Sequence, residues 1–137
     1  MLQSQTLSKK QIAESYAHRI WDLKDLSAID DLMHKDIILH SLLGDFKGKE
    51  SMRNVIQAWY EGFPDLKVEN LSILSENDQV VIHWKASGRH QGEFKGIPAS
   101  GKKVSYAGVT IYRIQEDKIS EYWAYLDLAH IFQQIKS

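Results

Sequence analysis

The chain has 137 residues, a formal net charge of −1 and 43% hydrophobic residues, which suits one ordinary globular domain over residues 1–137. The weak net charge argues against nucleic acid as a partner, because phosphate binding requires a concentrated basic surface. The absence of cysteine excludes disulfide bonds, thiolate metal ligands and cysteine nucleophiles.

The sequence carries no targeting or membrane pattern. Residues 1–10 lack the apolar segment of a secretory signal, and no apolar run approaches the roughly 20 residues that a transmembrane helix needs. A chain without cysteine also suits a reducing compartment. We therefore expect a cytoplasmic protein without a membrane partner.

The first half of the chain has helical periodicity. Ser8 and Gln11 have the spacing of a capping box, which marks the start of a helix. Ile12, Tyr16 and Ile20 then recur at helical intervals. The patterns predict helices over residues 8–24, 26–33 and 52–63, and a strand over residues 36–43 that ends in a turn at 44–48.

The second half of the chain changes to long strands. Short polar segments at residues 76–79 and 115–118 separate neighbouring strands as hairpin turns do. The pattern predicts strands over residues 66–75, 80–91, 103–114 and 119–126, a loop over 92–101 and a final helix over 128–136. Helices followed by an antiparallel sheet indicate the α+β class.

Residues 104–114 are apolar on both faces of their predicted strand. Val109 and Ile111 alternate with Tyr106 and Tyr112, so neither face is clearly polar. Such a strand is expected to be covered on both sides, by helices on one and by another subunit on the other. We therefore expect a homodimer or a higher homo-oligomer.

Asp127 is a charged residue within an apolar segment, residues 121–132. A carboxyl group in apolar surroundings loses hydration, which favours its neutral form and suits general acid or base catalysis. Asp is also a favoured helix N-cap, and the residues from Leu128 onward have a helical pattern. The residues alone leave both roles open.

Several ordered motifs resemble a known family. They are GFPDLKV at residues 62–68, DQVVIHW at 78–84, GRHQGEFKGIPASGKKV at 88–104, YRI at 112–114 and KISEYW at 118–123, followed by Asp127. Together they resemble the SnoaL-like polyketide cyclases, within the NTF2-like or ketosteroid-isomerase-like superfamily. The match covers most of residues 8–135.

The resemblance implies a cone-like fold, in which N-terminal helices pack on a curved, mostly antiparallel sheet and enclose a pocket, with a short C-terminal helix. It also implies an intramolecular aldol condensation without metal or organic cofactor. The acid/base aspartate of the family lies a few residues after the Trp of the last strand, where Asp127 lies here. The sequence departs from the family at Tyr122, where His is usual, and at Ala99-Ser100.

The candidate site has one catalytic residue, Asp127. His90 and His40 are candidates to bind a substrate oxygen, although a histidine bonded to the backbone is an equally ordinary structural element. The spacing of the histidines matches no compact metal motif, so we expect no metal site. Aromatic candidates for the wall of an apolar pocket, which are otherwise core residues, are Trp59, Phe63, Trp84, Tyr106, Tyr112 and Trp123.

Three hypotheses about function follow from these residues. The first is a cofactor-independent enzyme in which Asp127 transfers a proton alpha to a carbonyl of an apolar small molecule. The second is a non-catalytic module for ligand binding or dimerisation, favoured by Tyr122 and by the two apolar faces of residues 104–114. The third is water addition to an epoxide, which needs a second carboxylate in the pocket.

Overall fold

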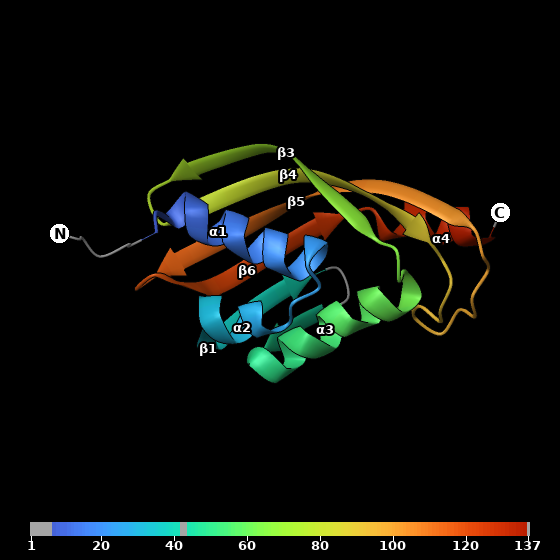
Figure 1. The fold of residues 1–137 in the computed structure, drawn as a ribbon, viewed down its shortest axis with the longest axis horizontal. Helices are drawn as coiled ribbons and strands as arrows, with labels where there is room; N and C mark the ends of the chain where they lie inside the picture. The colour runs from blue at the N-terminus through green and yellow to red at the C-terminus, as the bar shows by residue number, and fades with distance from the viewer. Residues whose placement is uncertain (1–6, 42–43, 137) are drawn as a thin grey trace.

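The computed structural model describes residues 7–41 and 44–136. Helices lie against one face of a long, curved sheet, and the chain ends in a helix beside one end of that sheet (Figure 1). The elements are α1 (Lys9–Ala17), the π-helical turn η1 (His18–Asp22), α2 (Ser27–Leu32), β1 (Met33–Ser41), β2 (Gly44–Lys47), α3 (Lys49–Gly62), β3 (Lys67–Glu76), β4 (Gln79–Arg89), β5 (Lys103–Gln115), β6 (Lys118–Leu126) and α4 (Leu128–Lys136). The predicted α+β class is confirmed.

The six strands form one sheet in the order β2-β1-β6-β5-β4-β3. β1 and β6 are parallel, and every other neighbouring pair is antiparallel, so the sheet is mostly antiparallel as predicted. The predicted turn at residues 44–48 is wrong in part, because Gly44–Lys47 forms β2 and pairs with β1. The segment has only four residues, begins with Gly44 and is followed by Gly48, a pattern typical of a turn. It forms a strand because it pairs with β1.

Side-chain hydrogen bonds cap the N-termini of two helices, α1 and α4. Ser8 and Gln11 form the predicted capping box, with the Gln11 backbone N–H donating to the Ser8 hydroxyl at 3.1 Å and the Ser8 N–H donating to the Gln11 side chain at 2.9 Å. At the start of α4, the His130 N–H donates to Oδ1 of Asp127 at 3.0 Å. Each bond satisfies a backbone donor that the first turn of a helix leaves without a partner.

The C-terminal helix closes an open sheet edge. β5 begins at Lys103, but its pairing with β6 starts only at Gly108, so residues 103–107 lack a strand on that side. The Gln134 side-chain amide donates to the Ser105 carbonyl at 2.9 Å and accepts from the Ser105 N–H at 2.9 Å. The glutamine therefore replaces a neighbouring strand and holds α4 beside the sheet.

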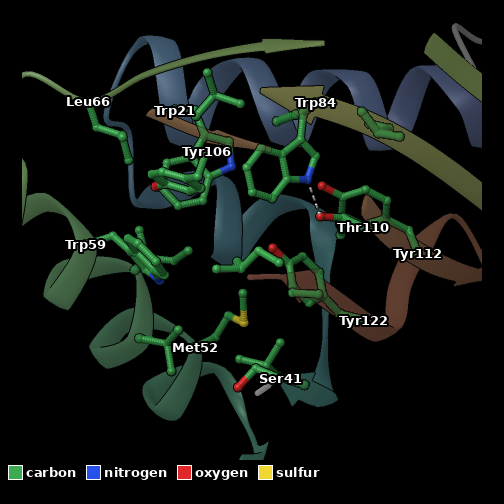
Figure 2. Close-up of a pocket in the computed structure, with 18 of the residues that line it drawn as sticks. Trp21, Ser41, Met52, Trp59, Leu66, Trp84, Tyr106, Thr110, Tyr112 and Tyr122 are labelled. Atoms are coloured by element: carbon green, nitrogen blue, oxygen red, sulfur yellow. Dashed lines mark hydrogen bonds between the residues drawn. The ribbon is translucent and has the colours of Figure 1, made fainter. Parts of the chain in front are cut away.

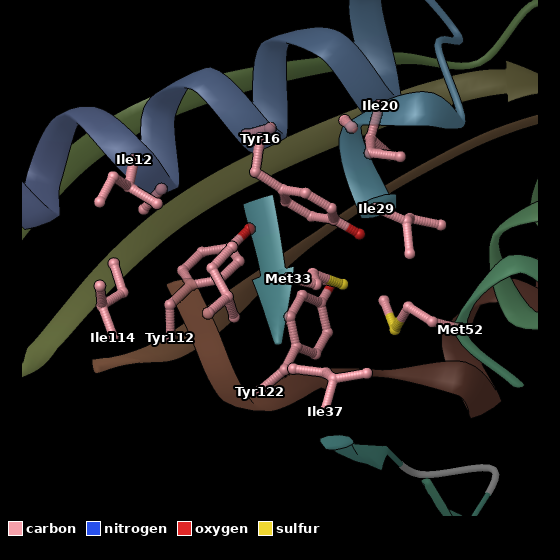
Figure 3. Close-up of a cluster of buried hydrophobic side chains, with 14 of the residues drawn as sticks. Ile12, Tyr16, Ile20, Ile29, Met33, Ile37, Met52, Tyr112, Ile114 and Tyr122 are labelled. Atoms are coloured by element: carbon pink, nitrogen blue, oxygen red, sulfur yellow. The ribbon is translucent and has the colours of Figure 1, made fainter. Parts of the chain in front are cut away.

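Alternate residues of the strands face the helices. On β4 the face carrying Val80, Ile82 and Ala86 is buried, as the alternation predicts. Figure 3 shows these helices and strands converging on a cluster that includes Tyr16, Tyr112 and Tyr122. A second cluster lies under α3 and α4. Within the described residues, no helix combines the length and apolar character needed to span a bilayer.

Candidate functional site

A cavity lies between the inner face of the sheet and helices α1 and α3, where the two hydrophobic clusters meet. Its volume is about 70 Å³. A single water needs roughly 10–15 Å³, so the cavity has room for roughly five waters or a small ring system. The wall is formed by Ala17, Trp21, Leu39, Ser41, Met52, Val55, Ile56, Trp59, Leu66, Val68, Asn70, Ile82, Trp84, Tyr106, Thr110, Tyr112, Tyr122, Ala124, Leu126 and Leu128 (Figure 2).

The lining is aromatic and aliphatic. Trp59 stacks on Tyr106 with ring centroids 5.8 Å apart, and Trp84 meets the Tyr106 ring edge-on at 5.8 Å. None of the described lining residues carries a carboxylate or an imidazole. A charged group placed in such a cavity would cost several kcal/mol, because no counter-charge lies in the wall.

Four lining residues form a polar cluster at one end of this cavity: Trp84, Thr110, Tyr112 and Tyr122. The indole N–H of Trp84 donates to Oγ1 of Thr110 at 2.9 Å. The hydroxyls of Tyr112 and Tyr122 lie near Thr110. Thr110 is only 3% exposed, so the polar cluster is shielded from bulk water (Figure 2).

The tyrosines of the cavity are held in the neutral form. Burial raises the pKa of Tyr122 to about 12, and the nearby Thr110 hydroxyl opposes the shift only in part. Burial likewise raises the pKa of Tyr112 and of Tyr106. Their hydroxyls therefore act as hydrogen-bond donors rather than as bases at neutral pH.

The structure brings four of the predicted aromatic residues together in the cavity wall, namely Trp59, Trp84, Tyr106 and Tyr112. They come from α3, β4 and β5. On the two strands these side chains lie on the inner face, which the sequence indicated for Trp84 on β4 but left open for Tyr106 and Tyr112 on β5.

The prediction that His40 and Trp123 line the cavity is wrong. Both lie on the outer face of the sheet, where the imidazole stacks on the indole with ring centroids 5.3 Å apart. Alternation along β6 directs Tyr122 inward and therefore Trp123 outward. The error arises because both faces of β6 are aromatic, so hydrophobicity does not identify the inner one.

His40 belongs instead to an outer-face cluster with Asp45, Glu121 and Arg113. Its Nε2 lies 2.6 Å from Glu121 and its Nδ1 lies 3.2 Å from Asp45, while Arg113 bonds Glu121 at 2.9 Å. Carboxylates at both ring nitrogens favour imidazolium, and the bond to Glu121 is the largest cause that raises the His40 pKa. Among the described residues, no three His, Asp or Glu side chains are arranged to hold a metal ion.

Phe63 and His90 were also predicted to line the cavity, and this is wrong. Phe63 is fully buried but packs against Phe94 at 5.2 Å, under the loop that follows β4. His90 is fully buried beside it, and its Nδ1 lies 2.9 Å from the Ser100 hydroxyl. Ser100 and Phe94, both from the loop after β4, contact these two side chains, and neither Phe63 nor His90 is among the lining residues of the cavity.

Asp127 is not in apolar surroundings, and that expectation is wrong. Its side chain is exposed, and its carboxylate caps α4 through the bond to the His130 N–H. The residues on either side of it, Leu126 and Leu128, both line the cavity. Asp127 thus lies beside the wall of the cavity without forming part of it, because the chain leaves the sheet at this residue.

Sequence reasoning did not identify Thr110 and Trp21 as lining residues. Thr110 has the same parity as Tyr106 and Tyr112, so the signal was present in the alternation of β5. Trp21 lies in the π-helical turn that follows α1. This turn changes the angular spacing of the side chains, so the α-helical periodicity of α1 does not predict the direction of Trp21. Trp21 also lines a wider open groove, which it shares with Tyr106 and which runs from the cavity wall to the surface.

Comparison with known proteins gives a family and a fold. The sequence profile of the SnoaL-like polyketide cyclases matches residues 11–135. AclR of Streptomyces galilaeus, a candidate hydroxylase, is 26% identical over 93% of this chain and 95% of its own, with a TM-score of 0.82. TsrD of Streptomyces laurentii is 25% identical over 98% of each chain, with a TM-score of 0.82.

A candidate SnoaL-like polyketide cyclase from Jannaschia has a TM-score of 0.85, is 21% identical and covers 100% of this chain and 98% of its own. A comparison with curated proteins gives no match. The cone of helices on a curved sheet is the NTF2-like fold that the sequence motifs implied. The family profile spans nearly the whole chain, and the chain belongs to the SnoaL-like polyketide cyclase family.

Proposed function

We propose that this chain is a cofactor-independent enzyme that carries out acid/base chemistry, a cyclisation or an isomerisation, on an apolar small molecule bearing carbonyl groups. Membership of a cyclase family supports an enzymatic role. The observation that carries the proposal is the enclosed cavity, whose wall is uncharged and whose hydrogen-bonding groups gather at one end. Such a wall fits a ketone better than an acid, an amine or a phosphate.

Asp127 is the residue we assign to proton transfer. It would remove a proton from the carbon alpha to a carbonyl. The enolate would then attack a second carbonyl, and the resulting alkoxide would take the proton back from Asp127. In an isomerisation, an enolate conjugated with a double bond would instead take the proton back at the far carbon of that double bond. Asp127 is flanked in sequence by two lining residues, Leu126 and Leu128, which supports its assignment to a ligand in this cavity. A ligand that covers the rim would also remove water from the carboxylate, which strengthens it as a base.

Exchange of carbon-bound hydrogen tests this assignment. In deuterium oxide the protein is expected to accelerate exchange of the hydrogens alpha to the ketone of 6-methoxy-1-tetralone, followed by proton NMR. Asp127→Asn keeps the N-cap but cannot accept a proton, so its exchange rate should fall by about 10²-fold or more. Asp117→Asn, in the turn between β5 and β6, is the matched control and should exchange at the wild-type rate. Equal rates in both variants would remove Asp127 from the mechanism.

A non-catalytic binding module is the second candidate. It is favoured by the lining of the described cavity, which contains no carboxylate and no imidazole. In that case the tetralone binds but its alpha hydrogens exchange at the rate of buffer alone. The same lining lacks the second carboxylate that water addition to an epoxide would need, so nothing in the wall favours that reaction.

A further inference from the structure

A glycine on the inner face of β5 lies opposite a tryptophan on β4. Gly108 and Trp84 are direct cross-strand partners. The backbone of Gly108 does not adopt the left-handed conformation that favours glycine. A Cβ atom at this position would instead lie 2.5 Å from Cζ2 of Trp84 and 2.6 Å from the Tyr125 carbonyl oxygen. The close approach of the indole and of the neighbouring strand to β5 therefore requires a residue without a side chain.

Two further contacts fix the indole of Trp84 in this place. Its N–H donates to Oγ1 of Thr110 at 2.9 Å, and Thr110 is the next inward residue after Gly108 along β5. Tyr106, the inward residue before Gly108, meets the indole edge-on at an interplanar angle of 86°. Figure 2 shows the indole between Tyr106 and Thr110. The six-membered ring of the indole thus covers the backbone of Gly108, while the N–H is directed at Thr110.

The indole occupies space that the cavity would otherwise include. Trp84, Tyr106 and Thr110 all line the cavity, whereas Gly108, which lies between them on the inner face, does not. A phenylalanine at position 84 would lack Cζ2 and Cη2, the two indole atoms nearest to the Cβ position of Gly108. Glycine has no side chain that could fill the vacated space. The cavity would then extend to the backbone of β5.

We propose that Trp84 is a specificity-determining residue, which closes the β5 end of the cavity and limits the size of the ring system that the cavity accepts. The proposal rests on the proposed function for the carbonyl group of the ligand and adds the size of the ligand. The cavity of about 70 Å³ holds a small ring system, and a further fused ring would have to displace the indole from Gly108. The substrate class is therefore a ketone whose buried part has one or two fused rings.

Two ketones that differ by one fused benzene ring test this limit, 1-tetralone and 1-oxo-1,2,3,4-tetrahydrophenanthrene. Calorimetric titration measures both affinities. Wild-type protein should bind the two-ring ketone about tenfold more tightly, because forcing extra atoms into a packed site costs more than their burial gains. Trp84→Phe should bind the three-ring ketone at least as tightly as the two-ring ketone. Trp123→Phe is the matched control, since it makes the same change on the outer face, and it should keep the wild-type preference.

Three results would overturn the size limit: equal binding of the two ketones by wild-type protein, an unchanged preference in Trp84→Phe, or a preference lost equally in Trp123→Phe. If Trp84→Phe does not fold, nuclear Overhauser effects in wild-type protein decide instead. Protons of bound 1-tetralone should then show contacts with the six-membered ring of the Trp84 indole, and a bound ketone without these contacts excludes Trp84 as the end of the cavity.

Exchange of the alpha hydrogens is a separate measurement on the same two ketones. A size preference without exchange would refute the proposed reaction and leave the size limit in place. Exchange together with equal binding of the two ketones would refute the size limit alone. Failure of wild-type protein to bind either ketone would refute both proposals.

Discussion

The two faces of β6 carry similar residues but lie in different environments. Tyr122 and Leu126 point inward and help to enclose a cavity whose polar atoms are uncharged. Trp123 and Tyr125 point outward, where Trp123 packs between charged partners of the outer-face cluster and Tyr125 is 50% exposed. Both faces carry aromatic residues, so what separates them is the helical layer that covers only one. The environment of an aromatic residue, rather than its type, determines whether it can bind a ligand.

The largest contrast between the faces is expected from one substitution made on each. Ile82 is 1% exposed on the inner face of β4, and Ile111 is half-buried on the outer face of β5. Ile82→Ala should lower the free energy of unfolding by about 2–5 kcal/mol, because it enlarges a void that cannot collapse. Ile111→Ala should cost about 1 kcal/mol. Urea unfolding of the two variants measures the difference, and equal losses would show that both faces are equally covered.

We propose that a second copy of the chain covers the outer face. Tyr125 and the 69% exposed Leu74 are the large apolar side chains that such a contact would bury. Tyr125→Asp should then weaken self-association by about 2 kcal/mol, roughly thirtyfold, because it introduces a charge where apolar contact is needed. Light scattering over a concentration series measures this effect. A wild-type monomer at micromolar concentration would contradict the proposal.

A smaller effect is expected from the titration of His40. Its folded-state pKa is raised by Glu121, so its contribution to stability is complete below the unfolded value of about 6.5 and is lost as pH rises through the folded value. For a partly exposed group we expect at most about 1 kcal/mol. The unfolding free energies of wild type and His40→Gln should therefore differ more at pH 5.5 than at pH 9. His83→Gln, exposed on the outer face of β4, is the control. A constant difference across this range would remove His40 from the pH dependence.

Much of the fold could be predicted because local patterns determine it. The capping box at Ser8, the alternation along β4 and β5, and the Asp127 cap each depend on residues close in sequence. The short strand β2 could not be predicted, because its conformation depends on pairing with β1. Local signals therefore determine most helices and hairpins, and pairing partners determine the rest.

The candidate site was less predictable. Trp84 lies on the continuously apolar face of β4 and Trp59 on the apolar face of α3, so their inward direction follows from local patterns. Trp123 and His40 were misplaced because their strands are apolar or mixed on both faces. His90 was misplaced for another reason. Alternation along β4 directs His90 inward, but the loop after β4 packs on it, and its Nδ1 hydrogen-bonds with Ser100 of that loop.

By itself the sequence determined the α+β class, the order of the elements and the family, since these depend on periodicity and on ordered motifs. It also placed Asp127 at the junction of strand and helix. Only the tertiary structure decided that this carboxylate is exposed, that the cavity wall is uncharged and that Thr110 accepts a hydrogen bond from Trp84. Burial and hydrogen bonding are set by segments distant in sequence, and the chemistry of a site depends on both.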